Sequence, residues 1–130
     1  MGQQEIEMIL SRHWSSYLDT PVFLIDPIGN LLYYNEPAEV ILGRRFAETG
    51  EMTAKEWSTI FSITDEEFRL LEPEELPLTI ALTERRPAFR RLYLAGLDKI
   101  QRHIATVCFP LMGQADRFLG AVAVFWELDD

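Results

Sequence analysis

Few side chains of this chain could carry catalytic chemistry. An enzyme needs a nucleophile with its base, or two carboxyl groups whose pKa values differ, and the sequence offers only Asp26 and His103 for such roles. Asp26 precedes Pro27 between two apolar runs, where an aspartate caps the backbone amides of a turn. His103 stands at the head of a predicted strand. The sequence therefore predicts no catalytic residue and a protein that is not an enzyme.

The sequence also lacks the residues that metal binding or redox chemistry would need. Cys108 is the single cysteine, which excludes an internal disulfide and a multi-cysteine metal site and suits a reducing compartment. Its place in a predicted strand favours a buried thiol that packs as a small hydrophobe over a redox role. The chain has neither a glycine-rich phosphate loop nor histidine, cysteine and carboxylate residues at metal-ligating spacing. We predict no metal site.

Composition and charge narrow the class of protein. The 130 residues fit one domain of ordinary globular composition, with 48% hydrophobic and 25% charged residues. A formal net charge of −9 repels phosphate backbones, so we expect no nucleic-acid partner. The N-terminus lacks the pattern of a signal peptide, and no apolar run approaches the roughly 20 residues that span a bilayer. We expect a cytoplasmic protein with no membrane partner.

The order of predicted elements indicates an α+β fold. Apolar residues on one helical face predict an amphipathic helix over residues 1–19, ahead of a domain over residues 20–130. Asn35 and Gly43 are the expected caps of a short helix. A capping box is predicted at residues 64–67. The predicted strands are 22–25, 31–34, 88–95, 101–110 and 119–128, and the predicted helices are 37–42, two or three within 44–76, and one from 76 that stops before 87.

The last two predicted strands are apolar on both faces. An antiparallel sheet with one face in water alternates apolar and polar residues, but residues 104–109 and 121–126 do not alternate in this way. The central helices can cover one face of the expected five-stranded antiparallel sheet. The N-terminal helix or a second subunit must then cover the other face.

Three stretches of the chain match one known family. Residues 21–43 read PVFLIDPIGNLLYYNEPAEVILG, residues 76–87 read LPLTIALTERRP, and the C-terminal part contains IATVCFPL and GAVAVF. In this order they resemble the opening, the cavity-bordering helix and the last two strands of a PAS domain. PAS domains are sensory and regulatory modules of bacterial signal-transduction proteins such as sensor histidine kinases. The resemblance covers residues 20–129 and implies a five-stranded sheet with short helices on one face.

The resemblance also implies which side chains face those helices. By this resemblance Ile104 and Ala121 point toward the helices, as do the residues that would line a ligand cavity. Small alanine side chains among them would leave room for a ligand. The candidate cavity residues are Leu78, Leu82, Thr106, Cys108, Ala123 and Phe125. Thr106 is the expected polar anchor for a small-molecule ligand. The alternative is a core packed to normal density, which leaves no cavity.

Two cofactors of the family do not match this sequence. Flavin-binding light sensors of the family carry their adduct-forming cysteine in a motif on a central helix, which residues 44–76 lack. Haem-binding members usually place a histidine ligand on a central helix. Here His13 falls in the N-terminal helix and His103 in a strand. The resemblance thus disfavours both flavin adduct chemistry and haem, and leaves the ligand unidentified.

The opposite face of the sheet is the expected dimer interface. Family members commonly dimerise through an N-terminal helix and the outer sheet face, so we expect a homodimer. The family often ends in an Asp-Ile-Thr triplet that passes the signal to an output domain; this chain has Glu127, Leu128 and Asp129 at these positions, and we expect no output domain within it. The chain is therefore expected to be a stand-alone module or a fragment of a longer receptor. The candidate interface residues are Ile6, Ile9, Leu10, Trp14, Tyr17, Val107, Phe109, Val122, Val124 and Trp126.

Three hypotheses of function follow. The first is a sensory module in signal transduction that binds a small ligand or a signalling protein and shifts the population of its helix and dimer arrangements. The second is a ligand-free module for dimerisation or protein–protein interaction, with a filled core. The third is a small cone-shaped isomerase or hydrolase. That enzyme needs acid and base residues in its cavity, whereas the inward positions offer only Thr106.

Overall fold

A computed structural model describes residues 11–128 other than 12, 16 and 97. Of the predicted N-terminal helix, Ser11 and residues 13–15 are helical, and Ile6, Ile9 and Leu10 lie outside the described residues. None of the described helices is long and apolar enough to cross a membrane.

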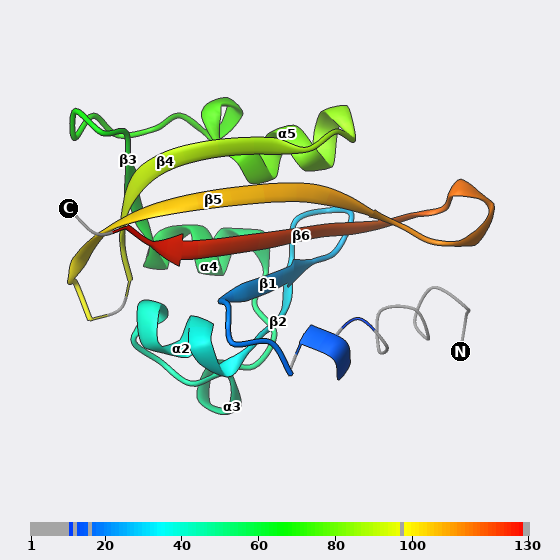
Figure 1. The fold of residues 1–130 in the computed structure, drawn as a ribbon, viewed down its shortest axis with the longest axis horizontal. Helices are drawn as coiled ribbons and strands as arrows, with labels where there is room; N and C mark the ends of the chain where they lie inside the picture. The colour runs from blue at the N-terminus through cyan, green and yellow to red at the C-terminus, as the bar shows by residue number, and fades with distance from the viewer. Residues whose placement is uncertain (1–10, 12, 16, 97, 129–130) are drawn as a thin grey trace.

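The described strands form one antiparallel sheet in the order β2-β1-β6-β5-β4-β3 (Figure 1). The long hairpin of β5 and β6 occupies the middle of this sheet, and β1 pairs with the far side of β6. The predicted α+β class is therefore confirmed. The strands are β1 (Val22–Ile25), β2 (Leu31–Tyr34), β3 (Ser62–Thr64), β4 (Ala88–Ala95), β5 (Gln101–Met112) and β6 (Phe118–Glu127).

The sheet has six strands, and the prediction of five was wrong. The additional edge strand, β3, pairs with the end of β4 in a region that we expected to be helical. No helix begins at residues 64–67, because the carboxylate of Asp65 accepts hydrogen bonds from the backbone N–H groups of Glu67 and Arg69, both at 2.9 Å. Such a side-chain turn competes with a helix start. Capping boxes lie instead at Thr53, ahead of α4, and at Glu72, ahead of the 3-10 turn of residues 73–75.

Short helices cover the inner face of the sheet. The helix α5 packs across β4, β5 and β6, while α2 contacts β1. The caps of α2 are the predicted ones, because Asn35 accepts from Ala38 N–H at 3.3 Å and Gly43 ends the helix with a φ of +79°. The helices are α2 (Glu36–Leu42), α3 (Phe46–Thr49), α4 (Ala54–Ile60) and α5 (Pro77–Glu84), with 3-10 turns η1 (Pro73–Glu75) and η2 (Gln114–Asp116).

Asn35 joins three segments of the chain. Its side-chain oxygen also accepts a hydrogen bond from Val22 N–H at 3.0 Å, and its Nδ2 donates to the carbonyl oxygens of Ser15 at 3.1 Å and Thr20 at 2.9 Å. Asn35 is fully buried, and these bonds use both donors and both acceptor positions of its amide. The segment that precedes β1 is thereby attached to β1 and α2.

Candidate functional site

A small cavity lies between the inner face of the sheet and the helices. Its volume is about 70 Å³, and side chains of β1, β4, β5 and β6 form one side of it. Five of the candidate cavity residues line it, namely Leu78, Thr106, Cys108, Ala123 and Phe125. The sixth, Leu82, does not line the cavity and packs against the neighbouring buried cluster that contains Ala81 and Ala121.

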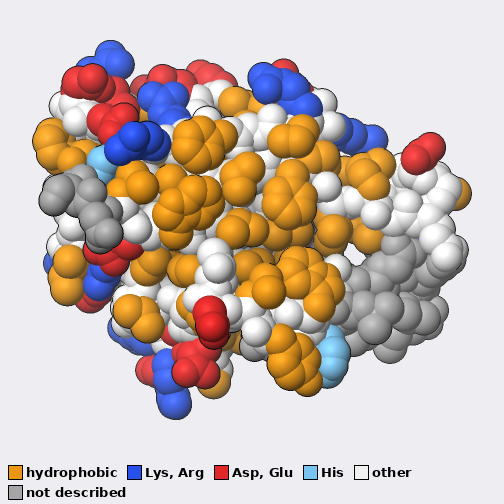
Figure 2. All heavy atoms as spheres, in the orientation of Figure 1, with side chains coloured by type: hydrophobic (Ala, Val, Ile, Leu, Met, Phe, Trp, Pro, Cys, Tyr) orange, Lys and Arg blue, Asp and Glu red, His pale blue; other side chains and the backbone are white. Residues whose placement is uncertain are grey.

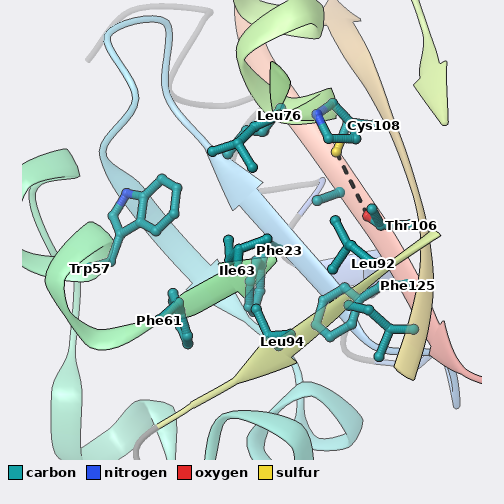
Figure 3. A pocket seen from close by; sticks show the side chains of 14 residues that line it. Phe23, Trp57, Phe61, Ile63, Leu76, Leu92, Leu94, Thr106, Cys108 and Phe125 are labelled. Atoms are coloured by element: carbon teal, nitrogen blue, oxygen red, sulfur yellow. Dashed lines mark hydrogen bonds between the residues drawn. The ribbon is translucent and has the colours of Figure 1, made fainter. Parts of the chain in front are cut away.

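The polar groups of this inner cavity are a hydroxyl and a thiol. The hydroxyl of Thr106 donates to the carbonyl oxygen of Val124 at 3.4 Å and lies 3.8 Å from the sulfur of Cys108 (Figure 3). Burial raises the pKa of the Cys108 thiol to about 12. The thiol is therefore protonated at neutral pH, and it lacks the thiolate character that redox or adduct chemistry needs.

Aromatic side chains form much of the remaining wall. The Phe23 ring lies edge-on to Phe125, with centroids 4.8 Å apart, and stacks on Phe61 at 6.1 Å. Trp57 contributes its ring, while its indole N–H donates to the carbonyl oxygen of Gly29 at 2.8 Å. The tryptophan N–H is thus already satisfied outside the cavity. The inner cavity is suited to apolar contents.

A second, outer pocket lies next to the inner cavity. Its volume is about 570 Å³, and its lining includes exposed residues such as Lys55, Leu70 and Glu72. The two spaces share wall residues that the sequence analysis did not select. The spacing of Trp57 and Phe61 correctly indicated a helix, but only the position of β3 shows that this helix end meets the sheet. The shared residues are Trp57, Phe61, Ile63 and Leu76.

The outer face of the sheet carries an exposed apolar patch. Figure 2 shows hydrophobic side chains gathered over β4, β5 and β6. Trp126 is 41% exposed and Phe89, which sequence analysis did not select, is 59% exposed. Their rings lie 6.4 Å apart. We call this surface the outer patch; it consists of Phe89, Val107, Phe109, Val124 and Trp126.

One predicted interface residue does not belong to the outer patch. Val122 is fully buried because it packs with Val22, Leu24 and Leu119 in a separate core on the same face. It therefore offers no surface to a partner in this structure. From the N-terminal segment, Trp14 and Tyr17 are exposed.

The structure keeps the two candidate catalytic residues apart. Asp26 follows β1 and accepts hydrogen bonds from the N–H groups of Ile28 and Asn30, as predicted for a turn. His103 lies at the opposite end of β6, where its carbonyl oxygen accepts from Leu128 N–H. No group of metal-ligating side chains occurs among the described residues.

His103 belongs to a cluster at the edge of the outer face. Its Nε2 lies 2.8 Å from the carboxylate of Glu66, which also pairs with Arg91 at 3.5 Å. The Tyr93 ring stacks on the imidazole with a centroid distance of 4.6 Å, and Phe68 stacks on Tyr93 at 4.5 Å. These contacts give the histidine a structural role near the start of β5.

Comparisons with known proteins identify the fold. No family model matches this sequence, and no curated protein matches it. Among solved structures, the PAS domain of BvgS from Bordetella pertussis is 15% identical with a TM-score of 0.65, over 95% of this chain and 87% of that one. The PAS domain of nitrogen regulation protein NR(II) from Vibrio parahaemolyticus is 14% identical with a TM-score of 0.65, over 92% and 98%. A Rhodobacter sphaeroides LOV protein is 16% identical with a TM-score of 0.71, over 98% and 69%. The chain therefore has the PAS fold.

Proposed function

We propose that the chain is a sensory module in signal transduction, which binds a small ligand in its inner cavity and pairs with a second copy through its outer patch. The observation that carries this proposal is that β5 and β6 border both regions. Thr106, Cys108 and Phe125 face the inner cavity, and Val124 and Trp126 alternate with them on the outer patch. Structural neighbours that include a domain of a two-component sensor histidine kinase agree with this role.

Because inward and outward residues alternate along β6, a ligand in the inner cavity and a partner on the outer patch would contact the same strand. A ligand that changes the packing on the inner side of β6 shifts the strand that supports the outer patch. If the two arrangements of the dimer differ in ligand affinity, ligand binding changes their populations. This mechanism makes and breaks no covalent bond, in keeping with the separation of Asp26 from His103.

A ligand-free dimerisation module is the second candidate. It is favoured by the volume of the inner cavity, about 70 Å³, because pockets for drug-sized ligands measure roughly 300–1,000 Å³. On this alternative the inner face is a packed core and only the outer patch has a function.

Native mass spectrometry of freshly purified protein, beside a denatured sample and an absorbance spectrum, tests the proposal. A dimer with additional non-covalent mass is the expected result. An empty, colourless dimer would favour the second candidate, and failure to bind added ligands would then overturn ligand binding. A monomer at tens of micromolar would contradict the dimer in both.

A pair of charged variants locates the interface. Phe89→Lys places a charge in the outer patch and is expected to give a monomer by light scattering, because an unpaired charge is costly to bury. Val40→Lys adds the same charge at an exposed position of α2 and should leave the dimer intact. Dimers of equal stability in both variants would place the interface elsewhere.

A further inference from the structure

The inner cavity and the outer pocket adjoin each other and share four lining side chains. Trp57, Phe61, Ile63 and Leu76 line both spaces, so each has one side toward the cavity and another toward the pocket. Figure 3 shows Trp57 and Phe61 across the cavity from Thr106 and Cys108. Displacement of these shared side chains would join a space of about 70 Å³ to one of about 570 Å³.

Three of the four shared residues lie in short segments at the ends of helices or at the edge of the sheet. Phe61 is the extended residue that ends α4, and Leu76 is the extended residue between η1 and α5. Ile63 is the middle residue of β3, a three-residue edge strand that pairs with β4 on one side and is bridged on the other by the Leu71 N–H, which donates to the Ile63 carbonyl oxygen. We call Phe61, Ile63 and Leu76 the partition. Short edge segments open at lower free energy than central strands.

Hydrogen bonds attach Trp57 and the start of α4 to the turn between β1 and β2. The Trp57 indole N–H bonds to Gly29, and the backbone N–H of Ala54 donates to the side-chain oxygen of Asn30 at 3.1 Å. Displacement of the end of α4 and of β3 would leave these bonds in place.

An unsatisfied hydroxyl adds a reason for β3 to move. Thr64 Oγ1 is buried and has no hydrogen-bond partner in the described part of the chain. A buried polar atom without a partner is destabilising relative to the hydrated state. Displacement of β3 toward solvent would hydrate this hydroxyl and offset part of the lost strand pairing.

The lining defines the chemistry of the contents. Among the residues that the structure describes, no lysine, arginine, aspartate, glutamate or histidine lines the inner cavity, and the Thr106 hydroxyl donates to a backbone oxygen. A charged ligand would lose its hydration there without gaining a counter-charge. An uncharged apolar molecule loses little on entry and gains contact with the aromatic wall.

We propose that the inner cavity takes an uncharged hydrophobic molecule of the size of a single aromatic ring, which enters from the outer pocket by displacing the partition. This inference rests on the proposed function and specifies its ligand and entry route. An apolar cavity of roughly 150 Å³ holds benzene or xenon. The inner cavity, at about 70 Å³, is smaller than that, and displacement of the partition would enlarge it for an aromatic ring.

Toluene and xenon are the probes that test the inference by protein NMR. Toluene is expected to shift the amide signals of Phe61, Ile63 and Leu76 and to speed hydrogen exchange at Leu71, whose N–H donates to the Ile63 carbonyl at 3.1 Å. Xenon is expected to shift signals of cavity residues without changing exchange at Leu71. Toluene binding with unchanged partition signals and exchange would overturn the entry route.

Two alanine variants provide the matched control. Ala123→Leu fills the inner cavity and is expected to weaken toluene binding by about tenfold or more. Ala47→Leu adds the same side chain on an exposed position of α3 and should leave the affinity unchanged. Equal affinities in both variants would place toluene outside the cavity.

Charged analogues separate this inference from the proposed function. Benzoate and anilinium are expected to bind at least about tenfold more weakly than toluene, because the cavity offers them no counter-charge. Tighter benzoate binding that Ala123→Leu abolishes would overturn the ligand class but keep a ligand-binding function. Absence of binding by xenon, toluene and benzoate, together with an empty native mass spectrum, would overturn both.

Discussion

The inner and outer faces of β6 show how neighbouring residues with similar chemistry acquire different roles. Phe125 faces the helices and is 2% exposed, whereas Trp126, the next residue, faces the outer patch and is 41% exposed. The difference arises from what covers each face. Helix α5 and the wall around Trp57 cover the inner face.

Because of this difference, residues of the inner face contribute to folding, and residues of the outer patch contribute to association with a partner. A side chain that is covered within the chain contributes to folding at any protein concentration. A side chain of the outer patch gains burial only when a partner covers it, so its contribution depends on concentration. Substitutions on the two faces should therefore differ in magnitude and in their dependence on protein concentration.

The largest effect is expected from truncation of the adjacent aromatic residues. Phe125→Ala should lower the free energy of unfolding by about 3–5 kcal/mol, the usual cost of deleting a buried aromatic ring. Trp126→Ala should cost less than about 1 kcal/mol in dilute, monomeric protein, because its side chain is already partly hydrated. Urea denaturation measures both. Equal losses in dilute protein would break the comparison.

A smaller effect is expected from the thiol of the inner face at alkaline pH. Because burial raises the Cys108 pKa to about 12, an unfolded chain ionises first as the pH rises. The stability from the protonated thiol is fully present below about pH 9, and it falls by about 1 kcal/mol at pH 10 and further toward pH 12. Urea denaturation at pH 8 and pH 10 under reducing conditions measures this loss.

Cys108→Ala is the control for the alkaline prediction. It removes the thiol while other groups, including Tyr34, whose pKa is raised chiefly by burial, still titrate. The wild-type chain should lose more stability than Cys108→Ala between pH 8 and pH 10. An identical loss of unfolding free energy in the two proteins would show that water reaches the thiol. The inner face would then be hydrated like the outer face.

The smallest effect is expected at the edge of the outer face. Glu66→Gln keeps an acceptor near His103 and removes the charge that faces Arg91. Because Glu66 is exposed, the free energy of unfolding should fall by less than about 1 kcal/mol. The same denaturation experiment measures it. If Glu66→Gln lost more stability than Phe125→Ala, the exposed edge would contribute more to folding than the buried inner face, which would contradict the comparison.

Elements with local signals were predictable from the sequence. The turn with Asp26, the caps Asn35 and Gly43, and the β-rich last third each depend on residues that are close together in the chain. The structure confirms these predictions. The resemblance to PAS domains then implied the inward direction of Thr106 and Phe125, which apolar periodicity alone left open because both faces are apolar.

The remaining features depend on contacts between distant segments. Strand β3 has three residues, and Asp65 beside it has the same local pattern as a helix cap. Its identity as a strand comes from pairing with β4, about 30 residues further along the chain. For the same reason the partition and the outer pocket were not predicted. The burial of Val122 likewise follows from packing against β1, which no local pattern reports.

The hydrogen bonds of Asn35 have a mechanical consequence. Its amide holds the carbonyl oxygens of Ser15 and Thr20 on one side and the N–H groups of Val22 and Ala38 on the other. A pulling force on the segment that contains Ser15 and Thr20 therefore acts on the buried Asn35 side chain as well as on the backbone that leads into β1. Asn35 acts as an anchor at which tension or torque from upstream is transferred to β1 and α2.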